Sequence, residues 1–140
     1  ELDQAFHPQS VTILLEDEIN VSRGDMLVKP NNQPNNSQDL DARICWFSGA
    51  KKLTKGAKFL FRQTSKEAQV LVSEVRYKID VNSLRKNEDD QELGMNDIGR
   101  VSLRTSQPVF WDSYRRNRNT GSFILVDPFT NETLGAGLWL

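Results

Sequence analysis

The densest group of chemically capable side chains is a run of arginines late in the chain. Arg115, Arg116 and Arg118 lie within four residues, and Tyr114 directly precedes them. Arginine binds carboxylate and phosphate groups through paired hydrogen bonds, so this cluster can contact an anion or an acidic protein surface. The alternative is a solvated loop that pairs with the chain's own acids in Glu88–Glu92, because runs of charge usually form solvated faces. The sequence leaves both interpretations open.

Residues for catalysis or metal binding are scarce. His7 is the only histidine and Cys45 the only cysteine, so neither a usual zinc site nor a nucleophile–histidine pair is expected. Gly49–Gly56 contains glycines and lysines, but its spacing is wrong for a phosphate loop, and we interpret it as a basic turn. We interpret Cys45 as a small, partly buried apolar residue. We therefore expect no catalytic, cofactor-binding or metal-ligating residue in this chain.

Length and charge narrow the class of protein further. The 140 residues correspond to one ordinary domain, or to one domain with a remnant of another. Eighteen basic and nineteen acidic residues give a net charge of −1, so no overall field attracts nucleic acid or anionic lipid. No apolar run approaches the ~18 residues needed to cross a bilayer. A single cysteine fits a reducing compartment, so we expect a cytoplasmic protein without membrane or nucleic-acid partners.

Alternation of apolar and polar residues dominates the chain and predicts strands with one face on a core. The turn signals between these runs predict an all-β fold, either a barrel or a sandwich. The expected strands cover Val11–Leu15, Leu40–Trp46, Ala57–Arg62, Ala68–Ile79, Ile98–Thr105, Ser122–Val126 and Leu134–Leu140. The core is expected to include Trp46, Phe59, Phe61, Val101 and Phe123.

Three local features refine this pattern. The apolar phase slips by one residue near Ser73–Glu74, which predicts a β-bulge or a change of buried face there. Ser83–Leu93 is polar on all sides and is expected to be a loop rather than a helix. Gly135 and Gly137 mark places where neighbouring groups approach the last strand closely.

A polar stretch divides the chain into two unequal pieces. Residues 30–39 (PNNQPNNSQD) contain no apolar side chain and have the composition of a linker. Residues 40–140 hold most of the strand signals, whereas residues 1–29 hold two at most. Two strands cannot close a core, so residues 1–29 are expected to belong to a larger domain. The chain begins with Glu1 rather than Met, and we interpret it as an excised or processed piece.

Two stretches resemble a known family. Ser10–Val28 (SVTILLEDEINVSRGDMLV) resembles the end of the second domain of translation-type GTPases. Within it, LEDEINVSRGD resembles the GTPase subunit of sulfate adenylyltransferase more specifically. The tail is similar to the same branch in Tyr114–Gly121 (YRRNRNTG) and Phe123–Trp139 (FILVDPFTNETLGAGLW).

This resemblance implies a fold and a context. Residues 40–140 would be a Greek-key antiparallel barrel of the translation-factor third-domain type, and residues 1–29 the terminal strands of a second barrel. A GTP-binding domain using GTP and Mg would lie upstream, and a separate small catalytic subunit would be the partner. The complete enzyme would couple GTP hydrolysis to formation of adenosine 5′-phosphosulfate from ATP and sulfate. None of the family's nucleotide-binding motifs matches a position here, so no site residue is carried over.

A second function remains open, in which the chain is an RNA- or partner-binding barrel of a translational GTPase. Such a surface needs lysines and arginines distributed over one face to contact phosphates. The near-neutral charge and the single arginine cluster weigh against this alternative. The hypothesis to test is therefore a partner contact through Tyr114, Arg115, Arg116 and Arg118.

Overall fold

Nine strands and no helix form across residues 2–140, the part of the chain that this computed structural model describes. No segment there could cross a membrane as a helix. The strands are β1 (Asn35–Trp46), β2 (Leu53–Thr54), β3 (Lys58–Gln63), β4 (Lys66–Ile79), β5 (Lys86–Asn87), β6 (Glu92–Leu93), β7 (Ile98–Trp111), β8 (Ser122–Val126) and β9 (Thr133–Trp139). The predicted all-β class is confirmed.

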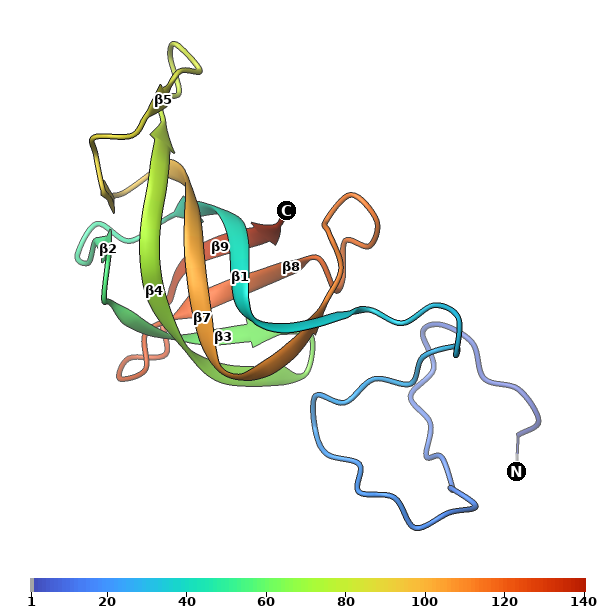
Figure 1. The fold of residues 1–140 in the computed structure, drawn as a ribbon. Helices are drawn as coiled ribbons and strands as arrows, with labels where there is room; N and C mark the ends of the chain where they lie inside the picture. The colour runs from blue at the N-terminus through green and yellow to red at the C-terminus, as the bar shows by residue number, and fades with distance from the viewer. Residues whose placement is uncertain (1) are drawn as a thin grey trace.

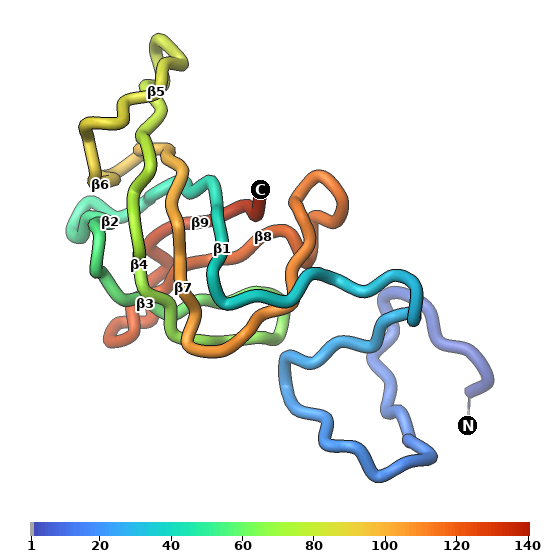
Figure 2. Tube along the Cα trace, viewed as in Figure 1, coloured from blue at the N-terminus to red at the C-terminus, as the bar shows by residue number. Residues whose placement is uncertain are grey.

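Six of these strands close into an antiparallel barrel. The spatial order is β3-β8-β9-β1-β7-β4, and the pairing of β4 with β3 completes the ring (Figure 1). Strands β3, β4 and β7 are successive neighbours in the barrel, and β1 lies beside β7 rather than beside β3. The connections among these four strands therefore form a Greek key. Strand β5 pairs with the end of β4 that projects beyond the barrel, and β2 pairs with β6 at one end of the barrel (Figure 2).

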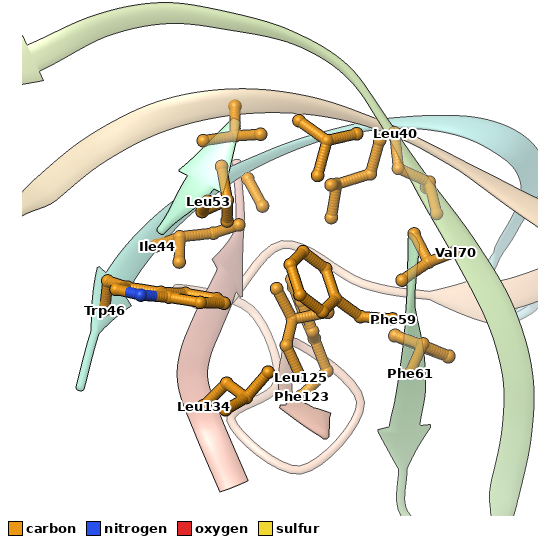
Figure 3. Packing of buried hydrophobic residues seen from close by; sticks show 14 of the residues in the cluster. Leu40, Ile44, Trp46, Leu53, Phe59, Phe61, Val70, Phe123, Leu125 and Leu134 are labelled. Atoms are coloured by element: carbon orange, nitrogen blue, oxygen red, sulfur yellow. The ribbon is translucent and has the colours of Figure 1, made fainter. Parts of the chain in front are cut away.

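Large rings from opposite sides of the barrel meet in its interior. The five expected core residues, Trp46, Phe59, Phe61, Val101 and Phe123, are all buried, which confirms the prediction. The ring of Trp46 lies 5.2 Å from that of Phe59, and the ring of Phe61 lies 5.3 Å from that of Phe123 (Figure 3). Phe123 also stacks on Trp139 with the ring centres 4.0 Å apart. These contacts join β1, β3, β8 and β9 into one core.

Two glycines of β9 allow these rings to lie against the strand backbone. A Cβ atom at Gly137 would stand 2.1 Å from Cζ of Phe123, and one at Gly135 would stand 2.8 Å from Cε3 of Trp46. A side chain at either position would therefore displace a core ring. The expected close approach at both glycines is confirmed.

Local irregularities also follow the sequence pattern. The register between β4 and β7 shifts between Val72 and Glu74, as the phase slip predicts, and shifts again between Val75 and Tyr77. Residues 83–93 form no helix and consist of turns with the short strands β5 and β6. Cys45 is half-buried in β1, as predicted.

The front of the chain differs from expectation. The predicted strand Val11–Leu15 does not form, and Leu14 is 87% exposed. A strand is stable only when its N–H and C=O groups pair with a neighbour, and residues 2–140 offer this segment none. The blue trace of Figure 1 accordingly runs outside the barrel. The assignment of residues 1–29 to a second domain remains a prediction.

The expected linker is also shorter than its composition suggests. Strand β1 begins at Asn35, inside the predicted 30–39 segment, and Asn35 pairs with Trp111 while Ser37 pairs with Val109. Backbone pairing requires no apolar side chain, so polar residues can continue a strand beyond the core. Residues 35–39 of the expected linker therefore belong to β1, and the division of the chain into domains remains a prediction.

We expect Phe123→Ala to lower the free energy of unfolding by about 3–5 kcal/mol, because it removes a ring that is 4% exposed and leaves a cavity beside Trp139. Phe129→Ala is the matched control, since Phe129 is 90% exposed, and its effect should stay within about 0.5 kcal/mol. Urea denaturation measures both. Equal midpoints for the two variants would contradict the core described here.

Candidate functional site

The arginine cluster lies on the loop of residues 112–121, called the arginine loop below, which joins β7 to β8. Its two ends are tied together at the barrel rim. The Thr120 hydroxyl donates to Oδ2 of Asp112 at 2.7 Å, and the Asp112 amide donates to the Thr120 carbonyl at 3.3 Å. Within the loop, the amides of Arg116 and Asn117 donate to the Ser113 carbonyl. The loop is therefore an ordered turn rather than a free connection.

A buried glutamine supports the loop from below. Gln63, at the end of β3, is 2% exposed, and its Nε2 donates to the carbonyl oxygens of Phe110 (3.0 Å) and Thr120 (2.5 Å). These two carbonyls lie at the end of β7 and the end of the loop. Sequence reasoning missed Gln63 because it is polar, although it continues the buried alternation of Phe59 and Phe61.

The loop also folds back onto the end of β9. The Tyr114 amide donates to the Trp139 carbonyl at 3.2 Å, and the Trp139 amide donates to the Gly121 carbonyl at 2.9 Å. A Cβ atom at Gly121 would stand 2.4 Å from the Asn117 carbonyl oxygen and 2.5 Å from Cα of Tyr114. Only glycine permits this close return of the backbone. The orange loop in Figure 1 consequently lies near the C-terminus.

The three arginines are exposed but occupy different surroundings. Arg116 turns toward the front of the chain, where its Nη2 donates to Oδ1 of Asn32 at 2.7 Å. The guanidinium of Arg118 lies 6.0 Å from the ring centre of Tyr114. Arg115 lines a pocket on the side of β9. The structure thus brings Tyr114 together with Arg115 and Arg118 and directs Arg116 elsewhere.

The expected pairing of these arginines with the Glu88–Glu92 acids does not occur among residues 2–140. Lys52 pairs with Glu92, and Nζ of Lys78 lies 2.9 Å from Oδ2 of Asp90. The hydrogen bond to Glu92 raises the pKa of Lys52. Hydrogen bonds to Asp97 and then to Asp90 raise the pKa of Lys78, and the bond from Lys78 lowers the pKa of the Asp90 carboxyl group. Lysines nearby in the fold therefore pair with Asp90 and Glu92, and the acid that lies nearest to an arginine of the loop is Asp112, whose Oδ1 is 3.9 Å from Nη1 of Arg116.

The pocket beside Arg115 has a volume of about 320 Å³. It lies between β1, β9 and the arginine loop, and it is lined by Arg43, Ser113, Tyr114, Arg115, Leu138, Trp139 and Leu140. Arg43 reaches it because β1 pairs with β9 in a register that places Arg43 opposite Leu138. Sequence reasoning missed Arg43, since only this long-range register brings it close to Arg115.

Asp41, two residues before Arg43 on the outer face of β1, already has hydrogen-bond partners of its own. Asp41 accepts hydrogen bonds from Nη2 of Arg100 at 2.6 Å and from the Ser102 hydroxyl at 2.7 Å, and Nε of Arg76 lies 3.3 Å away. Burial raises the pKa of Asp41, but these hydrogen bonds and positive charges outweigh it and hold that pKa below its ordinary value. Asp41 therefore stays ionised and paired with β4 and β7.

No metal-binding group emerges from the described residues. Across residues 2–140, no three His, Cys, Asp or Glu side chains lie close enough together to hold a metal ion. The segment Gly49–Gly56 leads into β2 and a turn at Gly56, whose φ is +83°, rather than into a helix. It therefore lacks the helix N-terminus of a phosphate loop, as predicted.

Comparisons with known proteins agree over most of the chain. The family described as GTP-eEF1A C-terminal domain-like matches residues 39–139. The bifunctional enzyme CysN/CysC of Mycobacterium tuberculosis H37Rv is 41% identical over 137 residues, which are 98% of this chain and 22% of that protein. Sulfate adenylyltransferase subunit 1 of Bacteroides fragilis is 41% identical over 138 residues, 99% of this chain and 29% of that protein.

The solved structure of Sup35 complexed with GDP shares the fold at 20% identity. Its TM-score is 0.70, and the match covers 79% of this chain and 27% of that one. The chain therefore spans less than a third of each of these proteins.

We expect Gln63→Ala to loosen the arginine loop, because it removes both hydrogen bonds beneath the loop, those that Nε2 donates to the carbonyls of Phe110 and Thr120. The free energy of unfolding should fall by about 1–3 kcal/mol, and the Asp112 amide should exchange its hydrogen faster. Exposed Gln107 provides the control variant Gln107→Ala. Unchanged Asp112 exchange in Gln63→Ala, measured by NMR, would show that Gln63 does not support the loop.

Proposed function

Because this chain belongs to the GTP-eEF1A C-terminal domain-like family, we propose that it is the non-catalytic C-terminal barrel of the GTP-dependent subunit of sulfate adenylyltransferase. The observation that carries the proposal is identity of about 41% to such subunits over 98–99% of the chain, including the front segment outside the barrel. The likeness to Sup35 at 20% identity supports the fold alone.

In this proposal the complete subunit couples GTP hydrolysis to synthesis of adenosine 5′-phosphosulfate from ATP and sulfate in the cytoplasm. GTP and Mg would bind in an upstream domain, and a small catalytic subunit would carry out adenylyl transfer. Residues 2–140 contribute binding rather than reacting groups. The barrel supplies rigid strands, and the arginine loop supplies an exposed positive surface at their rim.

The front segment supports the same context. Its apolar side chains, including Ile13, Leu14 and Ile19, are exposed, as they would be if strands of a second barrel covered them in the longer protein. It contacts the β3–β4 turn at one point, where Nε of Arg23 donates to the Ser65 carbonyl at 3.2 Å and Gly24 packs against Lys66. We assign residues 1–29 to the end of that second barrel.

The arginine loop is the proposed contact with an acidic surface, either on the small catalytic subunit or on the upstream GTPase domain. Tyr114, Arg115, Arg116 and Arg118 are held by hydrogen bonds between Asp112 and Thr120, so their binding loses less conformational entropy than binding by a free tail. The RNA-binding alternative is not favoured, because the relative from Bacteroides fragilis, at 41% identity, is named sulfate adenylyltransferase subunit 1.

Removal of the barrel from the complete subunit tests the proposal. A subunit that ends before Leu40 of this chain should no longer purify with the small subunit, and it should lose GTP-stimulated synthesis of adenosine 5′-phosphosulfate. GTP binding by the truncated subunit serves as the control for folding of the upstream domain. A truncated subunit that still forms the complex and responds to GTP would overturn the proposed role in assembly.

The isolated 140-residue chain should hydrolyse neither GTP nor ATP, because its described residues contain no phosphate loop and no group arranged as a general base. Release of phosphate and pyrophosphate from the purified chain measures this. Turnover that persists at constant specific activity through a second purification would contradict the prediction.

A further inference from the structure

Two arginines that are distant in sequence line the same pocket at the barrel rim. Arg43 projects from the outer face of β1, and Arg115 projects from the arginine loop. Backbone pairing fixes both positions: Arg43 lies opposite Leu138 of β9, and the Tyr114 amide donates to the Trp139 carbonyl at 3.2 Å. The pocket is therefore built by tertiary structure rather than by a flexible run of charge.

Neither positive charge is neutralised within residues 2–140. No carboxylate oxygen lies within 4.0 Å of a guanidinium nitrogen of Arg43 or Arg115 in this part of the chain. The side-chain carboxylates of Asp41 and Asp112 have other partners, since Asp41 binds Arg100 and Asp112 accepts from Thr120. Two like charges lining one pocket favour an anion between them, and guanidinium groups bind carboxylates with paired hydrogen bonds.

The other residues that line the pocket indicate which kind of anion fits it. Leu138, Leu140 and the ring of Tyr114 provide apolar surface beside the two arginines. A volume of about 320 Å³ lies at the lower end of the range for ligand pockets, which is roughly 300–1,000 Å³. A free inorganic oxyanion has no apolar part to cover these walls. An acidic residue flanked by apolar residues on a protein segment matches both the charge and the walls.

We propose that this pocket binds a glutamate or aspartate side chain of an acidic–apolar protein segment, with Arg43 and Arg115 holding the carboxylate and Tyr114, Leu138 and Leu140 contacting its apolar neighbours. Assignment of that segment to the partner of this barrel rests on the proposed function, whereas the chemistry of the pocket does not. Arg116 and Arg118 do not line the pocket, so Arg115 is the arginine of the loop that acts in this pocket together with Arg43.

The probe is a blocked peptide of alternating leucine and glutamate, titrated into the isotope-labelled 140-residue chain and followed by NMR. Leu140 lines the pocket, so its α-carboxylate is blocked as an amide in every sample. We expect saturable shifts at the amides of Arg43, Tyr114 and Arg115. Arg43→Gln and Arg115→Gln should each weaken binding about tenfold or more, because each removes hydrogen bonds to a charged group.

Arg85→Gln is the matched control, since Arg85 is exposed in the connection between β4 and β5, outside the pocket, and the change removes the same charge. It should change the dissociation constant less than about twofold, as expected for an exposed charge. A peptide with glutamine in place of glutamate should not saturate. Arg115→Lys, which keeps the charge but loses the paired donors, should fall between wild type and Arg115→Gln. Spectra of the free variants establish that each remains folded.

Three results would overturn the proposal: equal weakening by Arg85→Gln and Arg115→Gln, saturation by the glutamine peptide, or tighter binding of inorganic phosphate or sulfate than of the acidic peptide at the same amides. The first two would show non-specific attraction, and the third would show a small-oxyanion site. This titration uses the isolated chain, so its failure is distinguishable from failure of the truncated subunit to assemble.

Discussion

The rest of the structure depends on the packing of three rings, those of Phe61, Phe123 and Trp139, at one end of the barrel. Phe123 stacks on Trp139, Phe61 lies 5.8 Å from Trp139, and Gly137 leaves the space that the Phe123 ring occupies. These rings come from β3, β8 and β9, so one cluster of rings fixes the spacing of three strands. Burial of several aromatic side chains contributes several kcal/mol, which explains why an exposed polar loop can be ordered at this rim.

The geometry of the arginine loop depends on this end of the barrel. Gln63 continues the buried side of β3 directly beyond Phe61, and it carries the hydrogen bonds that tie Phe110 to Thr120. Gly121 then lets the loop return against β9. A short run of charged residues thus becomes a rigid surface because buried groups beneath it determine its path. Rigid presentation lowers the entropic cost of binding a partner, which suits a domain that contributes contacts rather than reacting groups.

Neighbouring arginines in this loop serve different purposes, although their sequence positions look equivalent. Arg116 bonds to Asn32 and so links the loop to the connection with the front segment. Arg118 lies over the ring of Tyr114, and Arg115 shares a pocket with Arg43. The positive cluster is therefore divided: Arg116 bonds to the connection with the front segment, and Arg115 lines the pocket for which we propose anion binding. Side-chain direction rather than charge count decides which arginine is available.

The sequence alone determined the six strands that close the barrel, because alternation with a period of two records which face of a strand is buried. It therefore predicted the core rings, the slip at Ser73, and the close approach at Gly137. Tertiary structure alone decided what depends on partners distant in the chain. Among residues 2–140, the segment Val11–Leu15 has no neighbour to pair with. Strand β1 begins early because its backbone pairs with Trp111, and Arg43 lies near Arg115 because of the register of β1 with β9. Hydrogen-bond partners and register are long-range properties, and local residue patterns do not encode them.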